Sequence, residues 1–153
     1  VVRISNEPDF LTAVVPSANI IGTPHEIGRY FECLLQGGTL DGAEVFPART
    51  IRRAVAEQSY HELDDVIKLP IRYGMGFMLG AHHLSFYGPD TPRAYGHLGF
   101  SNVVAWADPD RELSVAFLNT GKPILTPEVA LWLRIMWVIA RRVPSDGKRP
   151  QWG

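Results

Sequence analysis

The amino-acid sequence predicts an α+β fold in which an antiparallel sheet is flanked by helices. Three observations lead to this prediction. Two helical patterns occupy residues 23–58, short strand patterns separated by turn residues follow from residue 71, and a long apolar helical pattern comes last. The length of 153 residues and the hydrophobic content of 46% are sufficient for one domain with its own core.

Composition argues against several kinds of partner. The net charge of −1 gives no electrostatic footprint for nucleic acid. The most apolar segment, residues 129–140, is shorter than the roughly 20 residues that a membrane span needs, and it contains Arg134. The single cysteine, Cys33, lies in an apolar helical pattern and is expected to be a buried, inert thiol. The sequence starts at Val1, without Met, in what resembles the middle of a domain, so we expect a piece of a longer protein.

The first helix is predicted after a stretch, residues 1–19, that has no clear period and is expected to connect other elements. Thr23 is placed to be the N-cap, the following proline fits the first helical position, and Glu26 completes a capping box. Gly37 and Gly38 end the helical pattern, because glycine accepts the left-handed conformation of a C-cap.

A hairpin and a second helix are predicted next. Asp41 and Gly42, between two short strand-forming runs, are a hairpin signal. Pro47 opens a helical pattern over residues 47–58. The polar and acidic residues 59–70 are expected to form a loop.

From residue 71 the period changes to that of strands. Residues 71–79 alternate around glycines and are expected to form one strand with a bulge or a close neighbour. Three further strands are predicted at "RAYGHLGF", "NVVAWAD" and "ELSVAFLNT", with turn chemistry in "DPDRE" between the last two. Residues 126–143 form the closing helix, which is apolar nearly all round and is therefore expected to need a second partner besides the sheet.

The stretch "YGHLGF" carries the candidate site. If residues 94–100 form a strand, His97 and Gly99 face the same side of it. Gly99 would let a substrate backbone or acyl group lie against the strand, and His97 would flank that slot as a donor or a titrating group. The Phe100 N–H would be available to an oxyanion if the strand lies at an edge. The alternative is structural, with His97 a polar strand residue and Gly99 a bulge.

Other chemistries have weaker signals. The only Ser-x-x-Lys match, Ser145 to Lys148, lies between prolines and contains a glycine, so a helix that would bring both side chains to one face is not expected. The five histidines lack the i, i+4 spacing of a helical zinc site, and the glycine-rich segment lacks the lysine of a phosphate loop. We therefore expect neither a metal nor a cofactor.

The order of these features resembles the C-terminal part of the serine β-lactamase and penicillin-binding-protein-like family, in its esterase-like branch. "TPHEIGRYFECLLQGGTLDGAEVF" resembles that family's helix–GG–hairpin segment, and "YGMGFMLG" resembles its strand entering the active-site sheet. "YGHLGF" resembles its third motif, His/Lys-x-Gly, and "WADPDRELSVAFLNTG" resembles the next two strands. The resemblance covers about residues 15–143 and implies the C-terminal part of a β-lactamase/transpeptidase-like fold.

The resemblance implies a hydrolase or acyl-transfer enzyme that works through an acyl-serine on an ester, peptide or lactam. The serine and lysine of Ser-x-x-Lys and a tyrosine of a second motif would lie in an N-terminal half. His97 and Gly99 match the third motif. Phe100 would place its backbone N–H in the oxyanion hole, and Ser101, the next substrate-binding candidate, stands where the family often continues with glycines.

We therefore expect one incomplete domain, with residues 1–70 forming a helical and loop segment that borders the active site and residues 71–153 forming the strands and closing helix. Lack of the N-terminal half would leave Trp132 and Trp137 under-covered, so the expected partner is that half or a second copy of the chain. Two functions stay open. One is the C-terminal portion of a serine hydrolase, inactive as this piece alone; the other is a non-catalytic truncated relative that serves as a binding or structural module.

Overall fold

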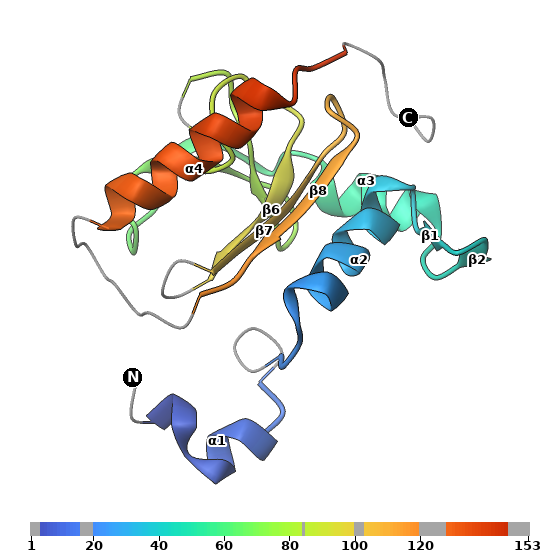
Figure 1. Cartoon of the computed structure of the whole chain (residues 1–153), viewed down its shortest axis with the longest axis vertical. Coiled ribbons are helices and arrows are strands. Elements are labelled where there is room, and N and C mark those ends of the chain that lie inside the picture. Colours follow the sequence, from blue (N-terminus) through green and yellow to red (C-terminus); the bar gives the residue numbers. More distant parts are fainter. Residues whose placement is uncertain (1–3, 16–19, 84, 100–102, 120–127, 147–153) are drawn as a thin grey trace.

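The computed structural model describes residues 4–15, 20–83, 85–99, 103–119 and 128–146. Its helices are η1 (Ile4–Asn6), α1 (Pro8–Thr12), α2 (Pro24–Leu35), α3 (Ala48–Val55) and α4 (Glu128–Arg142). Its strands are β1 (Thr39–Leu40), β2 (Ala43–Glu44), β3 (Ser59–Leu63), β4 (Pro70–Tyr73), β5 (Met78–Leu79), β6 (Tyr95–Gly99), β7 (Val103–Asp108) and β8 (Leu113–Phe117). The predicted α+β class is confirmed (Figure 1).

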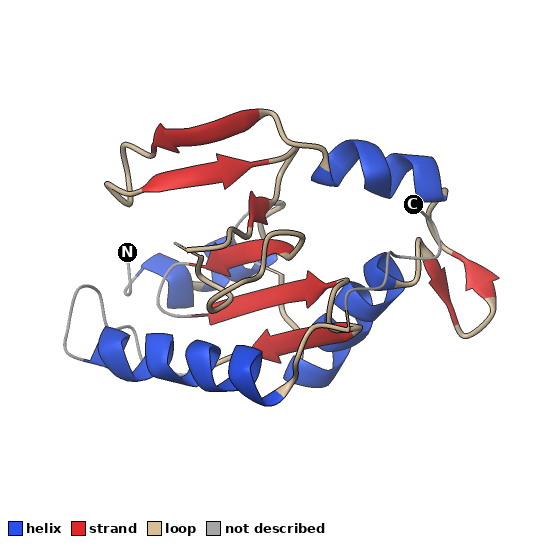
Figure 2. Cartoon of the chain, turned by 90° about the horizontal axis from the view of Figure 1, so that it is seen from above, coloured by secondary structure: helices blue, strands red, loops and turns tan. Residues whose placement is uncertain are grey.

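Six strands form one antiparallel sheet in the order β3-β4-β5-β6-β7-β8, so each strand pairs with its neighbours in sequence (Figure 2). β1 and β2 form a separate hairpin. Trp106 of β7 pairs with Gly96 of β6 on one side and with Val115 of β8 on the other. The three strands predicted after residue 80 are therefore present and adjacent.

Different helices cover the two faces of this sheet, with α4 on one face and α2 and α3 on the other (Figure 1). On the α4 face, Val104 and Trp106 pack with Trp132 and Met136. On the opposite face, Ala105 packs with side chains of α2 and α3. Because β7 alternates large and small apolar residues, its two faces accept different neighbours.

α2 begins and ends where the sequence predicts. The Glu26 N–H donates to Thr23 Oγ1 at 3.2 Å, and the Thr23 N–H donates to Glu26 Oε2 at 2.7 Å, which is the predicted capping box. Gly37 and Gly38 follow with φ of 72° and 98°. A Cβ on Gly38 would lie 2.0 Å from the carbonyl oxygen of Phe46, so glycine lets the β1–β2 hairpin fold back against the end of α2.

The prediction of a loop over residues 59–70 is wrong, because this stretch contains β3. β3 is one of the two edge strands of the sheet, and most of its residues are exposed. His61 has φ of 51°, and the register with β4 shifts between Ser59 and Glu62. The bulge interrupts the alternation that identifies a strand in a sequence.

The prediction of one strand over residues 71–79 is also wrong. The stretch contains β4 and β5, which pair antiparallel to each other. Between them the Gly74 N–H donates to the Phe77 carbonyl oxygen at 2.9 Å, and Gly76 has φ of 84°. The glycines that suggested a bulge are turn residues instead.

Other boundaries differ by a few residues. The expected connecting segment contains η1 and α1, which are too short to show a helical period. α3 ends at Val55, earlier than predicted, because Ala56 is extended with ψ of 133°. The predicted cap of the closing helix, Thr126 and Pro127, lies outside the described residues. None of the helices in the described ranges is long and apolar enough to cross a membrane.

Residues 80–94, the connection from β5 to β6, supply a partner for α4. Tyr87 is buried, stacks on Trp106 with ring centroids 5.6 Å apart, and donates to the Met78 carbonyl oxygen at 2.9 Å. Trp132 lies against the ring of Phe86 and is 4% exposed, so the expectation that it is under-covered is wrong. Trp137 is 47% exposed, and for this residue the expectation is confirmed.

Candidate active site

β6 carries His97 and Gly99 at an end that is paired on one side only. β7 pairs with all five residues of β6. β5 has two residues and pairs with Tyr95 and Gly96 alone. In the described part of the chain, residues 97–99 therefore have a free edge. The N–H and C=O groups of such an edge can bind an extended substrate.

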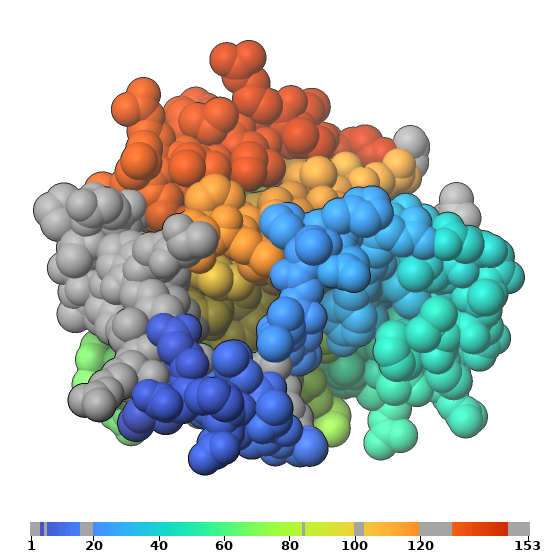
Figure 3. Space-filling view, turned by 60° about the horizontal axis from the view of Figure 1, so that its bottom comes forward, coloured from blue at the N-terminus to red at the C-terminus, as the bar shows by residue number. Residues whose placement is uncertain are grey.

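His97 lies on the sheet face that α2 and α3 cover, and the regular β6–β7 register places Gly99 on the same side, as predicted. Tyr95, two residues earlier, is 1% exposed beneath the helices, whereas His97 is exposed. The helices thus cover this face of the sheet at Tyr95 and leave it open to solvent at His97. Figure 3 shows a hollow in which atoms in the yellow of β6 and β7 lie recessed between α1, α2 and β8.

The imidazole of His97 has one ring nitrogen bound within the strand. Nδ1 lies 2.8 Å from the carbonyl oxygen of Leu98. A carbonyl oxygen only accepts hydrogen bonds, so Nδ1 carries the proton in this contact. In the neutral ring, Nε2 is then the nitrogen left to accept a proton or a hydrogen bond.

The two glycines of β6 differ in what surrounds them. A Cβ on Gly96 would lie 2.1 Å from the Ala105 carbonyl oxygen and 2.5 Å from Trp106 Cβ. A Cβ on Gly99 would meet the Cβ and the carbonyl oxygen of Val103, both at 3.3 Å. Packing within the sheet therefore requires glycine at position 96, whereas a small shift at Val103 would accommodate a methyl group at position 99.

Phe100 and Ser101, the predicted oxyanion and substrate-binding residues, lie outside the described residues. They follow Gly99 directly in the sequence. Their roles stay predictions.

Tyr95 and Ser85 do not supply the base and the nucleophile of an acyl-serine reaction. The Tyr95 hydroxyl is buried and has no hydrogen-bond partner among the described residues, and burial raises the pKa of Tyr95 above its usual range. The phenol therefore stays protonated near neutral pH. Ser85 Oγ lies 2.7 Å from Thr91 Oγ1 in the connection whose Phe86 and Tyr87 pack on the α4 face, the face opposite to that of His97.

The adjacent histidines His82 and His83 lie in the same connection rather than in a strand. His82 Nδ1 is 2.8 Å from Asp90 Oδ1, and both side chains are exposed. Across the described ranges, no three His, Cys, Asp or Glu side chains are grouped so that they could hold a metal ion. Cys33 is buried, as predicted, and burial raises the pKa of its thiol.

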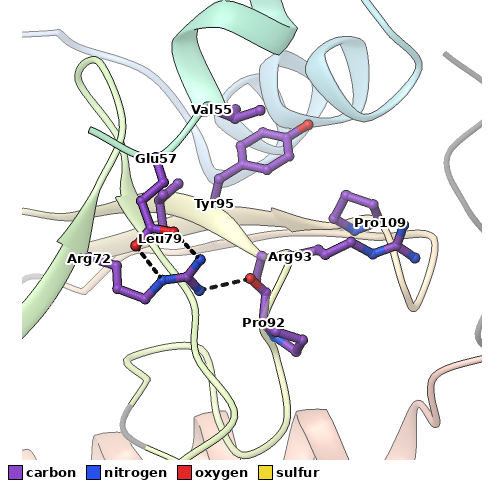
Figure 4. Close-up of a pocket in the computed structure, with 9 residues that line it drawn as sticks. Val55, Glu57, Arg72, Leu79, Pro92, Arg93, Tyr95 and Pro109 are labelled. Carbon is purple, nitrogen blue, oxygen red and sulfur yellow. Dashed lines mark hydrogen bonds and ion pairs between the residues drawn. The ribbon is translucent and has the colours of Figure 1, made fainter. Parts of the chain in front are cut away.

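A second hollow lies at the opposite end of β6 and was not predicted from the sequence (Figure 4). Its volume is about 240 Å³, and Arg72 and Glu57 lie in its wall. Arg72 binds both carboxylate oxygens of Glu57, at 3.0 and 2.8 Å, and donates to the carbonyl oxygens of Gly80 and Pro92. The hydrogen bonds from Arg72 lower the pKa of Glu57. This guanidinium is already neutralised, so its role is to tie β4 to the segments on either side.

Comparisons with known proteins identify the family of this chain. The model of the Beta-lactamase family matches residues 2–136. The chain is also 24% identical over 129 residues to the esterase/beta-lactamase LipL of Mycobacterium tuberculosis (strain ATCC 25618 / H37Rv), covering 84% of this chain and 28% of that protein. Because the family model matches most of its length, the chain belongs to the β-lactamase family.

Solved structures match in the same way. The crystal structure of a family VIII carboxylesterase superimposes with a TM-score of 0.74 at 27% identity, covering 88% of this chain and 36% of that chain. A penicillin-binding protein homolog from Caulobacter crescentus gives a TM-score of 0.63 at 31% identity, covering 77% of this chain and 31% of that chain. The predicted family and fold are confirmed, and the chain spans between 28% and 36% of the length of these three proteins.

Proposed function

We propose that these residues form the C-terminal part of a serine hydrolase that cleaves an ester or an amide through an acyl-serine intermediate. The observation that carries the proposal is the free edge of β6, where His97 and Gly99 face an open part of the sheet. Membership of the β-lactamase family supports the same reaction class.

In this proposal a serine from another part of the longer polypeptide attacks the substrate carbonyl. Its Oγ forms a bond to the carbonyl carbon and passes its proton to a neighbouring base. The bond to the leaving group then breaks and the leaving group takes up a proton. Water attacks the acyl-serine, releases the acid and regenerates the serine.

The residues of β6 bind and position the substrate. The open edge holds the substrate as an added strand, and the absence of a side chain at Gly99 lets the acyl group lie close to the backbone. His97 Nε2 accepts a hydrogen bond from the substrate at the rim of the slot. The N–H of Phe100 is the proposed donor to the oxyanion, and Ser101 is the next proposed substrate-binding residue.

The proposed N-terminal part also has a place to pack. β8 is the last strand of the sheet, and the five residues of this strand carry no charge, although exposed edges are usually protected by charged side chains. On α4, Leu131 and Trp137 are exposed. We propose that the preceding polypeptide covers this edge and this helix. A second copy of the chain on the same surface is the competing outcome.

The test uses the full-length polypeptide that contains these residues. We expect labelling by a fluorophosphonate and hydrolysis of p-nitrophenyl acetate, both lost when the serine of its Ser-x-x-Lys is replaced by alanine. His97→Ala should lower kcat/KM by about 100-fold, because the substrate loses a side chain that holds it in position. Full-length protein that is folded but shows neither labelling nor hydrolysis would instead support a non-catalytic binding module.

The isolated 153 residues are expected to show no ester hydrolysis, because the proposed nucleophile is not among them. Ser145→Ala is the control, since Ser145 begins the only Ser-x-x-Lys match. Turnover by the isolated chain that disappears in this variant would overturn the assignment.

A further inference from the structure

We propose that the β4–β5 turn, residues 74–77, forms an apolar wall beside the free edge of β6, and that Met75 makes the site select substrates with an alkyl chain. The inference rests on the proposed function, because it names the substrate class of that same site.

The register of the sheet places this turn beside the candidate site. Met78 is the first residue of β5 and pairs with Gly96, and pairing between β5 and β6 does not extend further toward Gly99. Phe77 is the next residue of this segment beyond that pair, and His97 is the next residue of β6. The aromatic rings of Phe77 and Tyr95 pack in a T-shaped arrangement, with their centroids 5.6 Å apart. The turn therefore lies next to the point where the free edge of β6 begins, at His97.

The turn is fixed in position by α3. The Met75 N–H donates to the carbonyl oxygen of Ala54 at 2.7 Å, and the Gly74 N–H closes the turn on Phe77. A Cβ on Gly74 would lie 2.5 Å from the same Ala54 oxygen. Glycine at position 74 thus allows the turn to lie close against the end of α3, which holds the apolar wall in place.

Its other side is open and apolar. The Met75 side chain is 61% exposed, and a Cβ on Gly76 would meet nothing within 4 Å. The four residues carry no charge. Methionine is flexible and polarizable and adapts to apolar ligands of varied shape. An exposed methionine on a fixed turn, next to a free edge that binds a substrate backbone, fits an alkyl chain in the acyl or the alcohol portion of the substrate.

The experiment compares Met75→Ser with the conservative Met75→Leu in the full-length protein. The substrates are p-nitrophenyl acetate, p-nitrophenyl octanoate (chain on the acyl side) and octyl acetate (chain on the alcohol side). We expect Met75→Ser to lower kcat/KM about fivefold more for one octyl substrate than for p-nitrophenyl acetate, and Met75→Leu to restore the wild-type ratio. Equal effects on all three substrates overturn the inference.

A binding measurement separates this inference from the proposed function. In spectra of the protein with ¹³C-methyl methionine, the signal that Met75→Leu removes should shift on addition of octanoate or octanol and not of acetate. If no ester is hydrolysed but the signal shifts, the proposed function fails and the apolar wall stands. If esters are hydrolysed and the signal does not shift, the wall is wrong; if neither is observed, both fail.

Discussion

At the scale of single residues, the two glycines of β6 are expected to have different roles, Gly96 in packing and Gly99 in substrate binding. Gly96→Ala should destabilise the protein by about 3 kcal/mol, because its Cβ would collide with the Ala105 carbonyl oxygen and with Trp106. Gly99→Ala should cost less than about 1 kcal/mol. If the proposed function holds, the same Gly99 variant should lower kcat/KM of the full-length protein about tenfold, since a methyl group displaces the substrate from the strand.

Denaturant unfolding and ester hydrolysis of both variants check this pair. Gly99→Ala with wild-type kcat/KM would support the structural alternative, in which Gly99 is a bulge. Gly96→Ala with wild-type stability would show that β6 and β7 are further apart than described.

Arg111 is a second residue with a large expected effect. It pairs with Asp108 at 2.8 Å, with both side chains almost fully buried, and donates to the carbonyl oxygens of Asp90 and Ala140. It thereby joins the β7–β8 turn, the 80–94 connection and α4. Arg111→Met should cost about 3–5 kcal/mol, because it leaves the Asp108 carboxylate buried without its ion-pair partner.

A double-mutant cycle measures this pair. Arg111→Met combined with Asp108→Asn should cost clearly less than the sum of the single variants, because the second change removes the buried charge. Strict additivity would mean that the ion pair has no coupling energy.

At the scale of elements, the β3–β4 hairpin contains a set of hydrogen bonds to Asp64 whose strength depends on pH. Asp64 accepts hydrogen bonds from the N–H groups of Ile67 and Val66 and from the hydroxyl of Tyr73. The Ile67 N–H is the largest cause of the lowered pKa of Asp64. Burial, followed by the Asp64 contact, raises the pKa of Tyr73 to about 12.

The lowered pKa sets the direction of the pH effect. In the folded state Asp64 releases its proton at a lower pH than in the unfolded state, so its contribution is complete above the unfolded pKa of about 4. It is lost as the pH falls through the folded value. Asp64→Asn should therefore reduce the difference in stability between pH 6 and pH 2.5, measured by urea unfolding. An unchanged difference in stability between the two pH values would show that these hydrogen bonds to Asp64 do not form.

Elements with strong local signals were predictable from the sequence. α2 follows from Thr23, Glu26 and the glycine pair, because caps are local hydrogen bonds between near neighbours. β3 was not predictable, since its pairing depends on β4 and its bulge at His61 hides the alternation. The split into β4 and β5 was missed because glycine in a strand pattern is compatible with a bulge as well as a turn.

At the scale of the whole molecule, the outward face of α4 tests how the longer polypeptide is assembled. Trp137 is 47% exposed here, with the Arg141 guanidinium 4.7 Å above its ring. If the preceding polypeptide covers this face, Trp137→Ser should destabilise the full-length protein by about 3 kcal/mol. Val66→Ser is the matched control, because Val66 lies on the β3–β4 hairpin and is 90% exposed.

Thermal and denaturant unfolding of the two variants give the result. A Trp137→Ser variant as stable as Val66→Ser would show that the face is free in the full-length protein. Loss of a dimer in Trp137→Ser, with the monomer equally stable, would assign the face to a second copy of the chain.

The candidate site divides in the same way between sequence and structure. The motif residues His97 and Gly99 were identified from the sequence, because alternation along a strand places them on one face. The Arg72–Glu57 pair that borders the opposite hollow carried no sequence signal, since its members are 15 positions apart and belong to different segments.

By itself the sequence determined the α+β class, the limits of α2, the strand β7 and the position of the third motif, because each depends on residues close to one another along the chain. Only the tertiary structure decided that β5 pairs with β6 through just two residues, which leaves residues 97–99 with a free edge. It also decided that the β4–β5 turn lies at the start of that edge. The free edge and the adjoining turn result from strand pairing and helix contacts between distant segments, which no local pattern encodes.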